Sequence, residues 1–335
     1  MGYSNDPEVR KAAASGGIVS EILVYLLESG SIDGAMVSRL KIERGDIAGE
    51  SIIAVDRNEI LSSGGSIYSQ TSSLPISEIK SFKGRVAVVG LPCDLRIYNR
   101  LSEKDKVLDE KTVLRIGLFC GHNSRKDLIR QVLERKEIVI DEIQRFRFRR
   151  GKWRGNVEIL LKSGDEIRFP FSHFSIYQNL HFFSQRKCIF CKDHTAELAD
   201  VSCGDAWLRH LKNEPIKHSV FIGRTKRGDD VIRRLTNEGR IAAENLSPRH
   251  VFASQKRSLI HHKSIRARAR AARWFGYHIA IEGSGRDRWN DYLAAMITAA
   301  NIRWSESKKY GSVVFKIPRP VLFMYLLLFK LLTNF

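Results

Sequence analysis

Cysteine is scarce in this sequence, with 5 among 335 residues, and the opening stretch MGYSNDPEVRKAAASGG lacks the apolar segment of a signal peptide. We therefore expect a cytoplasmic protein, whose cysteines stay reduced and serve a metal or redox site rather than structural disulfides. No GxGxxG fingerprint is present, so a Rossmann site for NAD is not supported. With 43% hydrophobic residues, the chain can fill a sizeable core and should be globular.

Acidic residues are also few, because 37 Asp and Glu stand against 56 Lys and Arg, a formal net charge of +19. This excess predicts a negative partner: nucleic acid, anionic lipid or a phosphorylated cofactor. The stretch RFRFRRGKWR at 145–154 alternates Arg with Phe. Alternation is more typical of a half-buried strand, with Phe inward and Arg outward, than of a nucleic-acid patch. Nucleic acid is therefore not the partner that we expect.

No apolar run is long enough to span a membrane. The longest, VLFMYLLLFKLLTNF at 321–335, falls short of the roughly 20 apolar residues that a spanning helix needs. It suits an interfacial anchor, with the basic run at 256–274 attracting anionic headgroups, and equally a helix docked on the core or on a partner subunit. The first reading predicts a peripheral position at the inner face of the membrane.

The hydrophobic pattern predicts an α/β fold with α+β elements. Residues 18–28 have the period of a helix, and the apolar runs at 84–90 and 113–121 suit buried strands of a sheet with helices on both faces. From 143 to 171 the period changes to two, which indicates an inserted β-meander. We expect a mixed sheet core with flanking helices, followed from residue 255 by a helical, basic C-terminal tail that lies at the periphery of the fold.

Four of the five cysteines occupy positions from which they could form one metal or redox site. Cys188 and Cys191 form a CxxC pair, whereas Cys93 and Cys120 each follow a predicted strand. Such a set can converge on one iron–sulfur cluster or one zinc ion, or remain as redox thiols, and spacing alone leaves these alternatives open. Cys203 lies in a strand-like run, where a small buried residue serves as well as a ligand.

Several ordered blocks carry a resemblance to a known family: AASGGIVSEILVYLLESGSIDGAMV, VVGLPCDLRIYNRL, IGLFCGH, CIFCKDHTAELADVSCGDAW and HSVFIGRTKRG. From about residue 7 to 250 the chain resembles the beta subunit family of coenzyme F420 hydrogenase and dehydrogenase. The resemblance implies FAD and a [4Fe–4S] cluster, with electrons passing between them and a deazaflavin or related substrate. Some similar bacterial proteins accompany polysaccharide biosynthesis, so a substrate of that pathway is also expected.

The resemblance also implies site residues and an organisation of the chain. The implied cluster ligands are Cys93, Cys120, Cys188 and Cys191. The implied flavin contacts are Ser15, Gly16, Gly17, Ser66, Tyr68, Ser72 and Asp205. Ser15, Gly16 and Gly17 would place a helix N-terminus against an anion, although their spacing alone favours a plain Ser cap with permissive glycines. We expect an N-terminal part at 1–80, a cysteine-bearing part at 81–250 and the basic tail at 251–335.

These expectations define a leading hypothesis and two alternatives. The leading one is a flavin- and iron–sulfur-dependent oxidoreductase, for which coenzyme F420 is one candidate substrate. Many relatives begin with a ferredoxin-like segment that would precede residue 1 here, so electrons should come from a separate ferredoxin-like or other electron-transfer protein. The alternatives are a zinc-stabilised nucleic-acid-binding protein and a membrane-associated scaffold without a cofactor.

Overall fold

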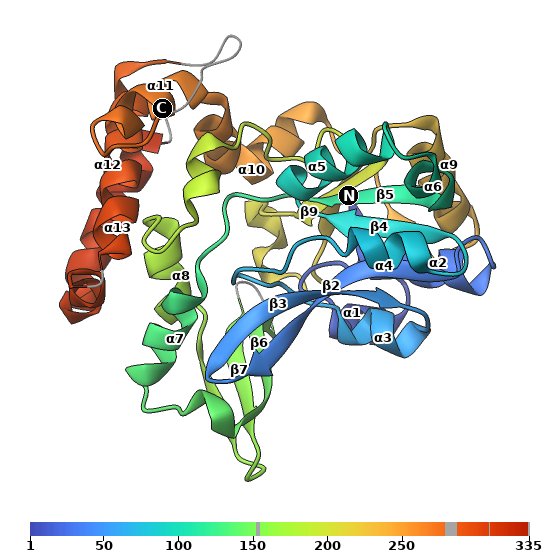
Figure 1. Ribbon diagram of the computed structural model, residues 1–335, viewed down its shortest axis with the longest axis horizontal. Helices are drawn as coiled ribbons and strands as arrows, with labels where there is room; N and C mark the ends of the chain where they lie inside the picture. Colours follow the sequence, from blue (N-terminus) through green and yellow to red (C-terminus); the bar gives the residue numbers. More distant parts are fainter. Residues whose placement is uncertain (152–154, 279–286, 308, 334–335) are drawn as a thin grey trace.

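The computed structural model describes residues 1–151, 155–278, 287–307 and 309–333. Its main feature is an eight-stranded mixed sheet (Figure 1). The four central strands are parallel, and the strands on both sides of them are antiparallel to their neighbours. In spatial order the strands are β11 (Ile241–Ala243), β1 (Gly2–Ser4), β10 (Ser219–Gly223), β9 (Val201–Asp205), β5 (Thr112–Leu118), β4 (Val86–Gly90), β2 (Gly34–Glu43) and β3 (Asp46–Ala54).

Helices cover both faces of this sheet, and β4 shows why. Its Ala87 and Val89 pack into one apolar cluster while Val86 and Val88 pack into another, because successive side chains of a strand point to opposite faces. The first cluster contains α2 (Ile18–Glu28), α3 (Arg57–Ser62) and α9 (Lys226–Asn237), and the second contains α4 (Ile76–Ser81), α5 (Pro92–Ser102) and α6 (Lys106–Lys111). The short α1 (Pro7–Ala12) follows β1.

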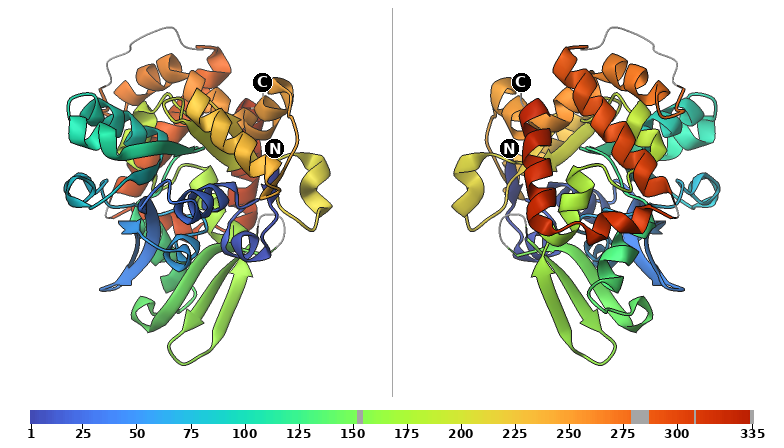
Figure 2. Two further views of the ribbon diagram at one scale, coloured as in Figure 1. Left: turned by 90° about the vertical axis from the view of Figure 1, so that its right-hand side faces the viewer. Right: turned by 90° about the vertical axis from the view of Figure 1, so that its left-hand side faces the viewer.

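The predicted meander is present as a separate three-stranded antiparallel sheet that projects from the main body (Figure 2). It consists of β6 (Ile143–Arg150), β7 (Asn156–Leu161) and β8 (Glu166–Pro170), and it packs on α7 (Lys126–Glu134) and α8 (Ser172–Asn179). Residues 152–154, the end of the arginine-rich stretch at 145–154, lie outside the described residues.

The expected orientation of the arginines in β6 is only partly right. Phe146 and Phe148 are buried as predicted, but Arg149 is buried too, with 5% of its surface exposed. The pairing of β6 with β7 shifts between Arg147 and Arg150, where three steps along β6 match two along β7. This extra residue interrupts the alternation, as β-bulges do, so Arg149 turns inward.

The C-terminal part is helical, as expected. It contains α10 (Pro248–Lys263), α11 (Ile265–Arg273), α12 (Trp289–Glu306) and α13 (Arg319–Thr333). The four 3-10 turns of the chain's described part are η1 (Ile140–Glu142), η2 (Arg186–Phe190), η3 (Arg209–Asn213) and η4 (Gly311–Lys316). In Figure 1, α12 and α13 form the side of the molecule opposite α9. Within the described ranges, none of the helices combines the length and hydropathy that a membrane crossing requires.

Candidate functional site

A cavity of about 310 Å³ opens at the carboxyl ends of the central strands. This is the edge at which open α/β sheets bind ligands, and the volume is near the lower end of the roughly 300–1,000 Å³ typical of small-molecule sites. The first turn of α2, the segments that follow β4 and β5, and the carboxyl end of β9 itself contribute to its wall. Of the predicted flavin contacts, the lining includes Ser15, Gly17, Ser66, Tyr68, Ser72 and Asp205.

The Ser-Gly-Gly segment is fixed by its own backbone contacts. Ser15 Oγ donates to the His218 carbonyl at 2.6 Å, and the Gly16 amide donates to Ser219 Oγ at 3.0 Å. A Cβ on Gly16 would lie 2.5 Å from the Gly2 carbonyl oxygen, so glycine is required there by close backbone packing. Gly17 has a φ of 82° and precedes α2 without a side-chain cap. Gly16 is absent from the cavity lining, whereas its two neighbours are part of it.

Two of the predicted flavin contacts, Tyr68 and Asp205, are linked by hydrogen bonds to Arg149, a residue that the sequence analysis did not predict in the site. Arg149 Nη1 donates to Asp205 Oδ2 at 2.6 Å and to the Tyr68 hydroxyl at 3.1 Å, and its guanidinium lies 4.8 Å from the ring centroid of Trp207. Burial opposes the charge of Arg149, but Asp205 and Tyr68 outweigh this effect and raise its pKa. The cavity wall therefore contains a buried ion pair, which holds two lining residues in place.

The four expected ligand cysteines come from three separate segments. Cys93 is in the first turn of α5 after β4, and Cys120 lies just beyond the end of β5. Because β4 and β5 are adjacent and parallel, their carboxyl ends bring these two cysteines to the same edge of the sheet. Cys188 is within η2, and Cys191 is the residue that ends this turn.

The electrostatics place the four thiols together. The pKa of Cys93 is raised to about 12, mainly by burial and in smaller part by Asp94, Cys191 and Cys188, while Lys187 acts in the opposite direction. Burial also raises the pKa of Cys120, with contributions from the other three cysteines. In contrast, burial is the one cause that raises the pKa of Cys203 to about 12, and the other thiols do not contribute to it. Cys120 also lines the cavity, so the set of four thiols lies beside the cavity.

The chemistry of this donor set fits a [4Fe–4S] cluster. All four cysteines are free thiols, and the cluster is held by four cysteine thiolates. The raised pKa values of Cys93, Cys120 and Cys188 show that the protein alone disfavours their thiolates, whereas a bound metal favours them. The same four thiolates could hold a zinc ion, with Zn–S bonds of about 2.3 Å. Among the described residues, no group of three or more His, Cys, Asp or Glu side chains is arranged to hold a metal ion.

The models of one protein family match most of the chain. The family is described as coenzyme F420 hydrogenase/dehydrogenase, beta subunit; its N-terminal model matches residues 1–77, and its C-terminal model matches residues 83–249. The chain belongs to this family. The expected resemblance and the α/β fold class are therefore confirmed, and the chain is an oxidoreductase of the coenzyme F420 hydrogenase/dehydrogenase beta-subunit type.

Individual relatives agree with this assignment. The coenzyme F420-dependent sulfite reductase of Methanocaldococcus jannaschii is 30% identical over 64% of this chain, which spans about a third (34%) of that protein. Coenzyme F420 hydrogenase subunit beta of Methanococcus voltae is 26% identical over 72% of this chain and 82% of its own. A chain of the F420-reducing [NiFe] hydrogenase complex of Methanosarcina barkeri shares the fold, with a TM-score of 0.60 at 21% identity over 86% of this chain and 94% of its own.

The family match ends at residue 249, yet the next two helices contact the cysteine segment. Arg268 of α11 has 2% of its surface exposed and donates to the carbonyls of Cys188 (3.3 Å), Ile189 (2.6 Å) and Cys191 (2.7 Å). Gln255 of α10 bonds the His194 ring at 3.1 Å and the Asp205 carbonyl at 2.6 Å. The expectation that the tail is peripheral to the fold is therefore wrong for α10 and α11.

A row of histidine rings lies beside the same segment. Neighbouring ring centroids are 4.3 to 5.4 Å apart along the series His122, His181, His261, His262 and His194. Burial is the main cause that lowers the pKa of every member, to about 4 for His122 and about 3 for His262. These imidazoles are neutral near pH 7, whereas Lys187 and Arg268 supply positive charge that acts on the thiols.

Proposed function

We propose that this chain is a flavin- and iron–sulfur-dependent protein of electron transfer. The thiols of Cys93, Cys120, Cys188 and Cys191 would bind a [4Fe–4S] cluster, FAD would occupy the adjoining cavity, and a deazaflavin of the coenzyme F420 class would be the substrate. One observation carries the proposal: Cys120 both lines the cavity and belongs to the group of four thiols. A partner that delivers or removes single electrons at the cluster is part of the proposal, because several relatives are named as subunits.

The described side chains suit this role. A bound flavin exchanges a hydride for single electrons, which a cluster can carry. Ile18, Val19 and Val37 give the cavity apolar walls that exclude water, while the hydroxyls of Ser66 and Tyr68 offer hydrogen bonds. The Asn123 amide donates to Cys188 Sγ at 3.4 Å, a contact that favours the thiolate form over the thiol.

Two cysteine variants test the ligand set. Anaerobically purified wild-type protein should be brown and contain both iron and flavin. Cys188→Ser should lose the iron and the visible absorbance of the cluster, while Cys203→Ser should keep both. Cys203 is a matched control because it is buried and lines the same cavity. Equal loss of iron in both variants would show that the ligands are wrongly assigned, and iron-free wild-type protein would refute the proposal.

The substrate is tested separately on reconstituted protein. Reduced coenzyme F420 should bleach the flavin absorbance under anaerobic conditions, with reoxidation by a ferredoxin-type acceptor. A protein that holds flavin and cluster but does not react with the deazaflavin would instead be assayed with substrates of polysaccharide pathways. That result would reject the deazaflavin and retain the cofactor assignment.

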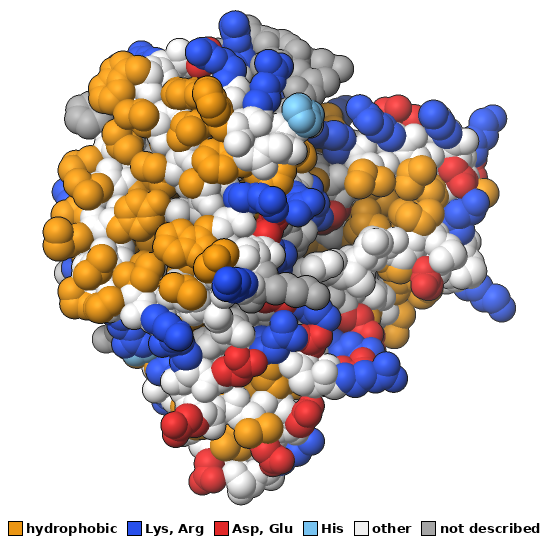
Figure 3. All heavy atoms as spheres, turned by 60° about the vertical axis from the view of Figure 1, so that its left-hand side comes forward, with side chains coloured by type: hydrophobic (Ala, Val, Ile, Leu, Met, Phe, Trp, Pro, Cys, Tyr) orange, Lys and Arg blue, Asp and Glu red, His pale blue; other side chains and the backbone are white. Residues whose placement is uncertain are grey.

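We also propose that α13 contacts an anionic membrane surface. One side of this helix packs on the core through Leu322, Leu326 and Phe329. The other side is apolar as well but more than half exposed, and it forms the broad hydrophobic surface of Figure 3. Its residues are Val321, Phe323, Met324, Leu327, Leu328 and Leu331. Arg319 and Lys330 belong to the same helix, so apolar insertion and attraction to anionic headgroups would act together.

Vesicle co-sedimentation tests this contact. The wild-type protein should bind phosphatidylglycerol vesicles, and the double variant Phe323→Asp, Leu327→Asp should not. The control Trp274→Asp changes another exposed apolar residue, which is 76% exposed outside α13, and should leave binding unchanged. Absence of wild-type binding would refute the membrane contact and would favour a partner protein on this surface.

A further inference from the structure

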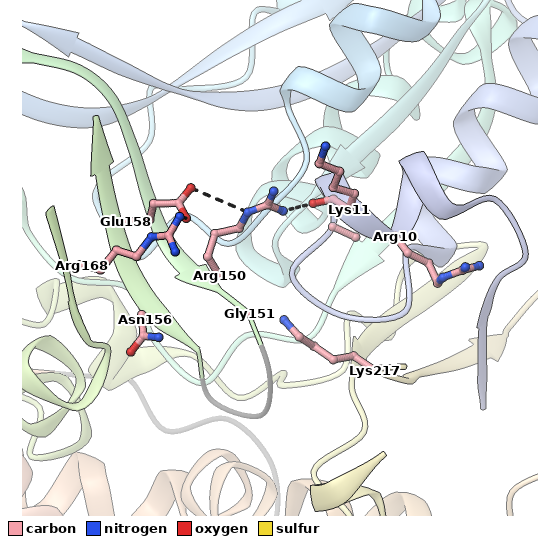
Figure 4. Close-up of a pocket in the computed structure, with 9 residues that line it drawn as sticks. Arg10, Lys11, Arg150, Gly151, Asn156, Glu158, Arg168 and Lys217 are labelled. Carbon is pink, nitrogen blue, oxygen red and sulfur yellow. Dashed lines mark hydrogen bonds and ion pairs between the residues drawn. The ribbon is translucent and has the colours of Figure 1, made fainter. Parts of the chain in front are cut away.

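A second pocket, of about 410 Å³, has an unusual concentration of positive charge (Figure 4). Five of its lining side chains are Lys or Arg and only one is a carboxylate. These cations come from α1, β6, β8 and the segment before β10, so the fold assembles them from four parts of the chain. They are Arg10, Lys11, Arg150, Arg168 and Lys217, and the carboxylate is Glu158. We call this site the cationic pocket.

The charge of the cationic pocket is only partly neutralised within the protein. Glu158 lies 3.9 Å from Arg150 and 3.3 Å from Arg168, as Figure 4 shows for the first pair, and Arg168 also pairs with Glu166 at 2.9 Å. Within the described ranges, Arg10, Lys11 and Lys217 form no ion pair with a carboxylate. Arg10 and Lys217 donate instead to the carbonyls of Ser4 and Ala14. Like charges gathered in this way repel one another, and a bound anion would remove that repulsion.

Lys217 is one of the partly buried cations of the cationic pocket. Its pKa is lowered to about 8, mainly by burial and in smaller part by Arg149 and Arg150, while Asp205 acts in the opposite direction. A negative ligand near its ammonium group would restore the charged form. The wall around it is held by the protein itself, because Arg150 donates to the Lys11 carbonyl at the end of α1. The pocket is thus preorganised for an anion rather than for an apolar group.

The cationic pocket adjoins the cavity at the carboxyl ends of the central strands. Ala13 lines both, and Lys217 Nζ is 3.1 Å from the carbonyl of Ala14, which lines the cavity. A molecule that begins in the cavity and extends past Ala13 would therefore carry its far end into the cationic pocket. Such a molecule needs two or more negative charges at that end, since a single charge would leave most of the cations uncompensated.

We propose that the cationic pocket binds the anionic end, phosphate or carboxylate, of a molecule whose ring system occupies the adjoining cavity. This inference rests on the proposed function for the identity of that molecule. The anionic end could belong to the dinucleotide part of the flavin cofactor or to an acidic side chain of the deazaflavin substrate. Both sources share the same recognition chemistry, because Arg and Lys bind phosphates and carboxylates through charge-assisted hydrogen bonds.

The first experiment uses inorganic pyrophosphate as the probe, so it does not depend on the redox assignment. Isothermal titration calorimetry should show binding to the full-length protein that weakens with added salt. The double variant Lys11→Gln, Lys217→Gln should bind at least about tenfold more weakly, as expected for the loss of charge-assisted hydrogen bonds. Lys212→Gln removes one charge from an exposed position outside the pocket and should bind like wild type. Equal affinities for all three proteins would overturn the proposal.

The second experiment identifies the source of the anion. FAD is compared with riboflavin, and the deazaflavin coenzyme with its chromophore lacking acidic groups. The Lys11→Gln, Lys217→Gln variant should lose affinity for the charged member of one pair and keep wild-type affinity for its uncharged counterpart. Weakening of charged and uncharged members alike would refute the pocket's role. If the wild type contains no flavin or iron but binds pyrophosphate as described, the proposed function fails while the anion site stands.

Discussion

Removal of the Arg268 guanidinium is the most demanding test of how the cysteine segment is held. Arg268 is almost completely buried and donates to four carbonyls, those of Cys188, Ile189, Cys191 and His262. The substitution Arg268→Met keeps an unbranched apolar side chain but leaves these four acceptors without their donor. No other residue of α11 is among the largest fully buried side chains of the described chain.

The magnitude follows from two opposing effects. Hydrogen bonds from a charged donor contribute about 1.5–3 kcal/mol each, so four of them at the lower value contribute about 6 kcal/mol. Against this, burial lowers the pKa of Arg268 from 12.5 to about 10, with the thiols of Cys191 and Cys188 opposing the decrease, and this decrease corresponds to about 3 kcal/mol against the charged form. We expect Arg268→Met to lower the free energy of unfolding by about 3 kcal/mol.

Urea unfolding of the cluster-free protein measures this loss. With a slope of about 2–3 kcal/mol per molar urea, the midpoint should fall by roughly 1–1.5 M. After anaerobic reconstitution, the variant should also retain less iron than the wild type. Arg268→Lys keeps the charge but lacks the planar fork that reaches several carbonyls, so it should recover only part of the loss. Arg266→Met, at an exposed position of the same helix, is the control. Equal midpoints for Arg268→Met and Arg266→Met would refute the reasoning.

Three further outcomes are expected. Arg149→Met leaves Asp205 in the cavity wall without its cation, so unfolding free energy measured in urea should fall by about 3–5 kcal/mol, and Arg149→Lys should restore part of it. Gly16→Ala brings a Cβ to 2.5 Å from the Gly2 carbonyl, so the same assay should show a loss of about 1–3 kcal/mol, and an unchanged midpoint would contradict the close packing. Lys217 carries its charge below its pKa of about 8 and loses it above, so pyrophosphate binding should weaken from pH 7 to pH 9 in the wild type and change less in Lys217→Gln.

The central sheet was predictable from sequence because its strands leave strong patterns. The strand β4, VAVVG, is buried at every position, and such continuous apolar runs are typical of parallel strands covered on both faces. The helix predicted at 18–28 coincides with α2. In contrast, β1 and β11 have only three residues each, too few to carry a periodic signal, and depend on pairing with each other and, for β1, with β10. The division at residues 80 and 250 stays a prediction.

Residues of the candidate site could be predicted where the residue type itself indicates the chemistry, as for cysteine. They could not be predicted where the role depends on burial in the folded chain. Cys93 and Cys120 each follow a predicted strand, and Cys188 and Cys191 form a CxxC pair, so these thiols are conspicuous in the sequence. The family resemblance implies that they form one ligand set, which stays a prediction. Arginine usually lies on the surface, and nothing in RFRFRR distinguishes Arg149 from its neighbours. Only the bulge in β6, which depends on the pairing with β7, turns that side chain inward.

Arg268 illustrates the same limit in a helix, and it changes how the C-terminal tail is understood. The segment IRARARAAR contains four arginines, and its alanines allow α11 to approach the cysteine segment closely. Of these arginines, Arg268 alone lies on the buried face, where Ala267, Ala271 and Ala272 surround it in sequence. Because its acceptors are the carbonyls of the CxxC segment, α11 fixes the backbone that carries two of the proposed ligands. The tail beyond the family match is therefore part of the structure that forms the site, and its positive charge acts at the thiols as well as at the surface.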